Sequence, residues 1–249
     1  MPYVGARQHS RHRLKSEVLH RAFVPQPNCK FNVDADTSIA SDTPYGRQLT
    51  SSLGNSIGGH VHLAKVDVAR QQLVTAIRLF FAREDAVSIY SLASNAWEVI
   101  DELCRLATVE SESLRTRSHI DRSKDLKRDY INSPYRNFFK HADRDPDAVL
   151  SGFTERSPEA VLFLACEDYI RLNRASPVEV QVFQFWFIAM YPEKLSEASS
   201  ADLAESIALA FPNIRALPRI EQINLGRVVL ERARNDQSIT SHPNTESTA

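Results

Sequence analysis

A short stretch near the middle of the chain, 133-SPYRNFFKHADRDPD-147, concentrates side chains that act on anions and protons. Arg136 and Lys140 carry positive charge, and His141 titrates near neutrality, so it can take or give a proton at physiological pH. A helix is expected to begin at Pro134, because proline at the first helical position loses no hydrogen bond. Arg136 would then lie in the first turn, where free N–H groups favour an anion. Such a set of groups suits the binding of a phosphate beside a proton carrier.

The helix that carries these residues is expected to end at Asp145-Pro146, since a residue before proline is pushed out of the α region. Arg136 and His141 are then five residues apart, roughly 140° around the axis, and share no strict face. Asn137 and His141 do share a face, and so do Arg136 and Lys140. Two neighbouring aromatic residues are expected to anchor this helix in the core: Phe138 and Phe139.

The segment that must position this stretch is a helical hairpin. Apolar residues recur at helical spacing from Val66 to Phe80, and a second series runs from Ile89 to Leu106. The polar joint 83–86 separates them, which predicts two amphipathic helices packed antiparallel. The strongly charged segment 110–131 that follows is either an exposed helix or a long loop.

Ser-Pro pairs punctuate the second half of the chain and predict helix starts near residues 134, 158 and 177. Glu179 lies three residues after Ser176, the spacing of a capping box. The run 177–191 is rich in β-branched and aromatic residues, but this box and its setting favour a buried helix. Further helices are expected at about 200–211 and 219–235, and the chain as a whole is expected to be all-α.

The chain is expected to divide into four parts: a basic, loosely ordered arm and linker (1–60), a helical bundle (61–150), additional helices packed on the bundle (151–235), and a disordered tail (236–249). The net charge of −1 indicates no particular partner. Only seven glycines are present, which argues against glycine-rich phosphate loops. The three cysteines are far apart and fit neither a disulfide framework nor a metal knuckle. This cysteine usage favours a cytoplasmic protein with reduced thiols. With no apolar run of ~18 residues, we expect no membrane span.

The residues Arg136-Asn137-Phe138-Phe139-Lys140-His141 match the pattern Arg-Asn-x-x-x-His, and they follow a helical hairpin. In both respects residues 64–150 resemble HEPN domains, which are all-α and often metal-independent ribonucleases. The resemblance implies an up-and-down bundle of about four helices with the signature on a late helix. It also implies a homodimer in which two copies of the motif face one cleft. The supporting acidic residue would come from the hairpin, where Glu98 and Asp101 are candidates by residue type.

Under this resemblance the catalytic residues would be His141, Arg136 and Asn137. His141 would act as general base or acid on the RNA 2′-hydroxyl, Arg136 would stabilise charge on the phosphorane, and Asn137 would orient His141. Lys140 and Arg144 would hold flanking phosphates of the substrate. The implied partners are RNA, a second copy of the chain, and a cognate antitoxin or other regulatory protein; no cofactor and no metal are expected.

Two other readings stay open at this point. The chain could be a non-catalytic helical module for dimerisation or partner binding, with Arg136 in a buried salt bridge and His141 inaccessible. A third interpretation is a small-molecule pocket lined by the aromatic helix 177–191. Arg136→Ala discriminates between the ribonuclease and the non-catalytic module. Breaking a buried ion pair costs ~3 kcal/mol of stability, whereas an exposed functional arginine can be removed with little change.

Overall fold

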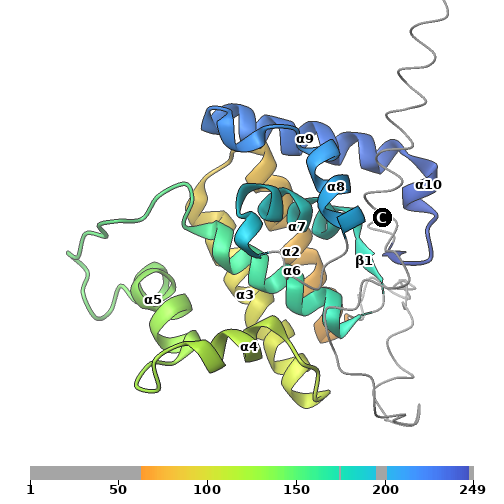
Figure 1. Ribbon diagram of the computed structural model, residues 1–249. Coiled ribbons are helices and arrows are strands. Elements are labelled where there is room, and N and C mark those ends of the chain that lie inside the picture. Colours follow the sequence, from red (N-terminus) through yellow and green to blue (C-terminus); the bar gives the residue numbers. More distant parts are fainter. Residues whose placement is uncertain (1–62, 174, 195–200, 247–249) are drawn as a thin grey trace, which may run out of the picture.

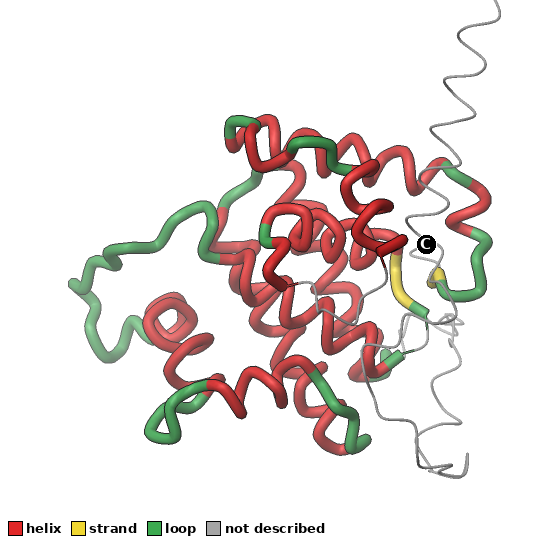
Figure 2. Tube along the Cα trace, viewed as in Figure 1, coloured by secondary structure: helices red, strands yellow, loops and turns green. Residues whose placement is uncertain are grey.

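The computed structural model describes residues 63–173, 175–194 and 201–246, and these form a mostly helical protein, as the sequence predicts (Figures 1 and 2). The basic arm and linker expected over residues 1–60 lie outside the described residues. The longer helices are α2 (Lys65–Ala82), α3 (Ala86–Leu106), α4 (Glu112–His119), α6 (Pro158–Leu172), α7 (Val178–Met190), α8 (Ala201–Ala210) and α9 (Arg219–Asn235).

Shorter elements connect these helices. They are a wide helical segment η1 (Leu126–Arg136), the single-turn helices α5 (Asn137–Lys140) and α10 (Gln237–Thr240), the 3-10 turns η2 (Pro192–Lys194) and η3 (Ile214–Ala216), and the two-residue strands β1 (Ser176–Pro177) and β2 (Thr245–Glu246), which pair in parallel. None of the helices in the described ranges is long and apolar enough to cross a membrane.

The predicted hairpin is confirmed: α2 and α3 pack against each other along their lengths and are joined by residues 83–85. Arg83 ends α2 in the left-handed region, with φ 63°. Asp85 begins α3, because its carboxylate accepts a hydrogen bond from the backbone N–H of Ser88 at 2.7 Å. Helix α6 lies along the other side of α3, so the hairpin is enclosed in the centre of the molecule (Figure 1).

Helix α7 is buried on almost every side, which confirms the buried helix expected at 177–191. It packs against α2, α6, α8 and α9. Its rings meet those of α2 in edge-on contacts; the Phe80 centroid lies 5.3 Å from that of Phe183 and 5.1 Å from that of Trp186. Aromatic pairs in this arrangement add to the stabilisation from area burial alone.

The expected capping box at the start of α7 is wrong. Ser176 lies in β1, and Pro177 is the residue that precedes the helix. The Glu179 side chain is fully buried and accepts hydrogen bonds from Arg78 of α2 and Arg234 of α9, with Nη2–Oε1 distances of 2.7 and 2.5 Å. Burial raises the pKa of Glu179, but the two guanidinium groups outweigh it and leave the pKa below its usual value. A long-range ion pair therefore replaces the local cap.

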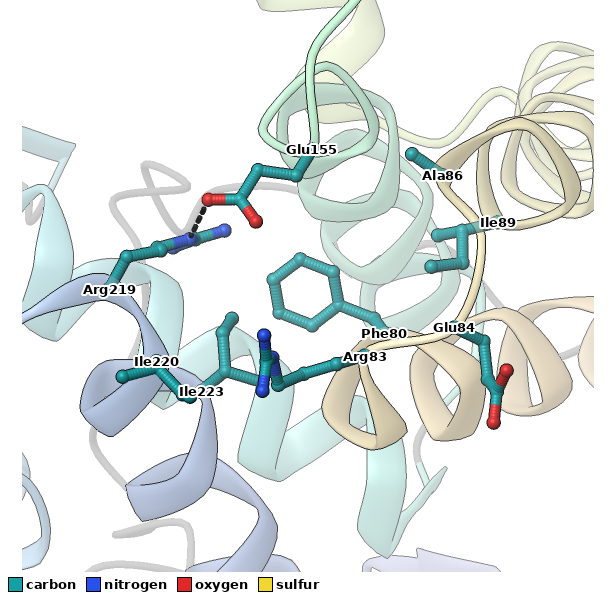
Figure 3. Close-up of a pocket in the computed structure, with 9 residues that line it drawn as sticks. All are labelled: Phe80, Arg83, Glu84, Ala86, Ile89, Glu155, Arg219, Ile220 and Ile223. Atoms are coloured by element: carbon teal, nitrogen blue, oxygen red, sulfur yellow. Dashed lines mark ion pairs between the residues drawn. The ribbon is translucent and has the colours of Figure 1, made fainter.

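Helix α9 lies directly on α2 because Gly226 has no side chain. A Cβ atom at this position would lie 2.2 Å from the Phe81 ring, well inside van der Waals contact. The close approach brings the start of α9 beside the end of α2 (Figure 3).

The tail expected to be disordered is structured up to Glu246. After α10, strand β2 pairs with β1, and the Tyr169 hydroxyl donates a hydrogen bond to Glu246 at 2.7 Å. Arg70 of α2 lies 3.6 Å from the same carboxylate. Long-range polar contacts, which composition does not reveal, hold this segment.

The contribution of the Glu179 ion pairs with Arg78 and Arg234, here called the clasp, to stability is testable. Glu179→Gln keeps the shape of the side chain but removes the charge that two arginines share. We expect a loss of about 1–2 kcal/mol in the free energy of unfolding, since both arginines are partly exposed and can turn to water. Glu102→Gln is the matched control, because Glu102 pairs with Arg105 on the surface; there the loss should be much smaller, since exposed ion pairs contribute little to stability. Urea denaturation measures both, and equal losses would contradict the clasp.

Candidate functional site

The segment that carries the sequence motif is a broken helix at the periphery. Ser133 interrupts it with φ −104° and ψ 135°, as expected for a residue before proline. The chain then re-enters a helical turn that ends at Lys140, not at Asp145-Pro146 as predicted. Residues 142–149 are all exposed and form part of a protruding loop (Figure 1). They bury no apolar face, and a short helix without such packing is not stable.

Arg136 is held firmly on α3. One terminal nitrogen, Nη1, donates to the carboxylate of Glu98 and, at 3.1 Å, to the side-chain oxygen of Asn132. The other, Nη2, donates to the side-chain oxygen of Asn95 at 2.8 Å. Only 12% of the Arg136 side chain is exposed. Arg136 lies in the helical turn that follows the break at Ser133, so its guanidinium group fixes this turn to the hairpin.

Glu98 is the acidic partner from the hairpin, one of the two candidates that residue type suggests. Its Oε1 also forms an ion pair with the ammonium group of Lys127, with an Nζ–Oε1 distance of 2.5 Å. Burial raises the pKa of Glu98, but hydrogen bonds from Lys127 and Arg136 outweigh it, so the pKa lies below its usual value. The other candidate, Asp101, binds Arg117 of α4 instead, at 2.8 and 2.6 Å.

An aromatic cluster packs the motif segment against α3. The Tyr90 ring of α3 meets the rings of Tyr135, Phe139 and Phe153 edge-on, with centroids 5.4 to 6.1 Å apart. The Tyr90 hydroxyl donates to the backbone oxygen of Ile131 at 2.7 Å, and burial raises its pKa. The prediction that both phenylalanines anchor the helix in the core is confirmed for Phe139, which is partly buried and packs against the core. It is wrong for Phe138, which makes its one ring contact, among the described residues, with Phe139.

His141 lies apart from the Arg136 anchor. It follows the last residue of α5, 39% of its side chain is exposed, and its Nδ1 lies 3.9 Å from Asp143. The Asn137 and Arg144 side chains are exposed and make no hydrogen bond within the described residues. Within these ranges the structure therefore shows no hydrogen bond that would let Asn137 orient His141.

Lys140 is a further cation whose charge interacts with those of Arg136 and Glu98. Partial burial lowers its pKa, the positive charge of Arg136 lowers it further, and Glu98 acts in the opposite direction. Lys127, Arg136 and Lys140 thus act electrostatically on Glu98, three positive charges to one negative charge. We name these four residues the Glu98 cluster. Its excess of positive charge lies directly before His141 in the chain and favours an anion.

Three residues that bind Arg136 or Glu98 were not predicted from the sequence: Asn95, Lys127 and Asn132. A signal for the first was present, because polar residues recur along one face of α3 at positions 91, 95, 98 and 102. Such a stripe on an amphipathic helix marks the face on which a polar segment packs. Nothing comparable marks Lys127, which lies in a run of mixed charge.

A second polar site is fully buried. The Asp168 carboxylate of α6 accepts hydrogen bonds from the backbone N–H and the hydroxyl of Ser113, at 3.1 and 2.5 Å. The Ser113 hydroxyl accepts in turn from the Trp97 indole at 2.8 Å. Burial is the main cause that raises the pKa of Asp168, to about 6. With no exposure to solvent, this network joins α3, α4 and α6 and is not a catalytic site.

Comparisons with protein-family models, curated proteins and solved structures find no match for this chain. The residues that the structure describes contain no group of three or more His, Cys, Asp or Glu side chains placed to hold a metal ion.

The anchor at Arg136 predicts a measurable loss of stability. Arg136→Ala removes a partly buried ion pair and two further hydrogen bonds, so we expect a loss of about 2–3 kcal/mol in the free energy of unfolding. Arg136→Lys should be intermediate, because an ammonium group cannot donate in the same fork. Arg144→Ala, in the exposed loop, is the control and should change stability by less than about 0.5 kcal/mol. A loss equally small for Arg136→Ala would contradict the anchor.

The buried Asp168 predicts a pH dependence. Its pKa is raised in the folded protein, from 3.8 to about 6, so it stabilises the fold below pH 4 and this contribution is lost as the pH rises to 6. Asp168→Asn has no proton to lose, so its stability relative to the wild type should improve between pH 4 and 6. Ser113→Ala keeps the carboxyl group and should not show this relative gain. A constant difference between Asp168→Asn and the wild type, in urea denaturation at several pH values, would contradict the shift.

Proposed function

We propose that the protein is a metal-independent endoribonuclease of HEPN type. The observation that carries the proposal is the Glu98 cluster, whose excess of positive charge directly precedes the accessible His141 in the chain. A phosphodiester is the anion that fits such a site, because the cations neutralise the phosphate while the imidazole handles a proton. The resemblance of residues 136–141 to the HEPN signature supplies RNA as the substrate class.

In the proposed reaction His141 takes the proton of the RNA 2′-hydroxyl. The 2′-oxygen attacks phosphorus, the bond to the 5′-oxygen breaks, and that oxygen takes up a proton. The products are a 2′,3′-cyclic phosphate and a free 5′-hydroxyl. Lys140 is exposed and has no ion pair among the described residues, so it can contact the phosphate, while Arg136 contributes its charge from a fixed position. Asn137 would orient His141 once substrate is bound, and Arg144 would hold a flanking phosphate.

The proposal includes a homodimer. One histidine takes a proton and a second one gives a proton in this reaction, and a chain with one motif supplies only one of them. A second copy, facing the first across a cleft, would provide the other. A cognate antitoxin or other regulatory protein would then be expected to cover the same cleft.

The second candidate is a non-catalytic helical module for dimerisation or partner binding. The observation that favours it is the engagement of Arg136: both terminal nitrogens already donate to Glu98, Asn95 and Asn132. In this reading Arg136 is structural, as a buried salt bridge would be. The exposure of His141 argues against it, since that reading requires an inaccessible histidine.

The deciding experiment measures cleavage of a mixed RNA by purified full-length protein. We expect His141→Ala to cleave at least about 100-fold more slowly than the wild type, the usual contribution of an acid–base group. Lys140→Ala should weaken substrate binding and leave the fold intact. EDTA should not inhibit, and the product ends should be 2′,3′-cyclic phosphates.

His119→Ala is the matched control, because His119 is an exposed histidine on α4 that bonds only to its own helix among the described residues. It should cleave as fast as the wild type. If His141→Ala keeps full activity, or if the wild type cleaves no RNA, the ribonuclease proposal fails. The second of these results leaves the non-catalytic module.

A further inference from the structure

A cavity of about 250 Å³ opens between the end of α2, the start of α9 and the segment before α6 (Figure 3). Its floor is apolar, formed by Phe80, Ile89 and Ile223. Charged side chains of both signs stand around this floor: Arg83, Arg219 and Glu155. None of these residues belongs to the Glu98 cluster. A pocket with an apolar body and a few convergent polar groups is the usual form of a small-molecule site.

Two of the nitrogen atoms of the Arg219 guanidinium group lack a hydrogen-bond acceptor among the described residues. Its Nη2 donates to the buried Glu159, and its guanidinium group lies 5.7 Å from the Phe80 centroid and 5.4 Å from the Trp186 centroid. Its Nε and Nη1 atoms are buried, yet neither makes a hydrogen bond within the described residues. A buried donor without an acceptor is costly, and a bound acceptor would remove that cost.

Arg83 faces the cavity from the opposite side (Figure 3). Its backbone is in the left-handed region at φ 63°, where residues other than glycine and asparagine are uncommon. Backbone hydrogen bonds to Leu79 and Phe80 hold it there. Its side chain is exposed and has no ion pair among the described residues. A cation without a partner is therefore held in a strained position at the rim.

The acidic residues of the cavity offer little competition. Glu155 lies 3.5 Å from Arg219 Nε, but 67% of its side chain is exposed, so the pair is weak and easily displaced. The Glu84 side chain points away from the cavity in Figure 3. Helix α9 also begins at this rim, and the positive end of its dipole adds to the attraction for an anion.

We propose that this cavity binds a small organic carboxylate with an apolar body. The apolar part lies against Phe80, and the carboxylate accepts hydrogen bonds from Arg219 Nη1 and from Arg83, displacing Glu155. Two guanidinium groups suit a carboxylate, since each can donate in a fork. The volume lies just below the ~300 Å³ of the smallest drug-sized pockets, which limits the ligand to a single ring or a branched chain.

Calorimetric titration of the full-length protein with phenylacetate tests the proposal, with 2-phenylethanol and phenethylamine as neutral and cationic analogues. We expect saturable binding of the acid and at least about tenfold weaker binding of both analogues. Arg83→Gln should weaken phenylacetate binding about tenfold without loss of fold, because its side chain is exposed. Glu155→Gln should strengthen it about threefold by removing the competing carboxylate.

Arg227→Gln, an exposed arginine of α9 away from the cavity, is the matched control and should bind as the wild type does. Ile220→Glu places a negative charge on the exposed cavity rim and should abolish binding of the acid. The proposal is overturned if phenylacetate does not bind at 10 mM (about the weakest affinity expected for so small a ligand). Binding that Arg83→Gln and Ile220→Glu leave unchanged would overturn it too, as would tighter binding of the alcohol or the amine. RNA cleavage has no part in these readouts.

Discussion

The burial of α7 on nearly all sides is the constraint on which the rest of the structure depends. Of its 13 residues 11 are buried, and three of these are polar: Glu179, Gln181 and Gln184. A buried polar group needs a partner, so each of them selects the element that packs beside it. Glu179 binds arginines of α2 and α9, Gln184 donates to Glu167 of α6, and Gln181 donates to the backbone around β1 and β2. The hydrogen-bonding needs of these three buried side chains thus determine which elements pack against α7.

The candidate site is built differently, on a segment outside this core. Its attachments are the ion pair of Arg136 with Glu98 and the ring contacts of Tyr90, both supplied by α3. Since α3 is enclosed by α2 and α6, it is a rigid support, whereas His141 stands at the start of an exposed loop. The positive charge is thus fixed on the hairpin, while the proton carrier that follows it in the chain is held by few contacts.

The sequence predicted the elements governed by local rules. Periodicity predicted the hairpin, and Ser133-Pro134 predicted a helix start at the position where η1 is interrupted. It failed where a distant partner decides. Glu179 has the spacing of a cap but binds arginines from two other helices, and Glu246 is held by Tyr169 and Arg70, which lie far away in the chain. At the site, residue type pointed equally to Glu98 and Asp101, and no local pattern could show which of them binds Arg136 or that Lys127 shares it.

The proposed ribonuclease activity requires that the Glu98 cluster bind a nucleic-acid phosphate. The most direct measurement is an NMR titration of the ¹⁵N-labelled full-length protein with a 2′-deoxy dinucleotide, which carries the phosphodiester but cannot be cleaved. We expect saturable shifts of the backbone amides over residues 126–144, centred on Lys140 and His141 and lost in Lys140→Ala. Amide shifts confined to other parts of the protein, or none at millimolar dinucleotide, would contradict the account.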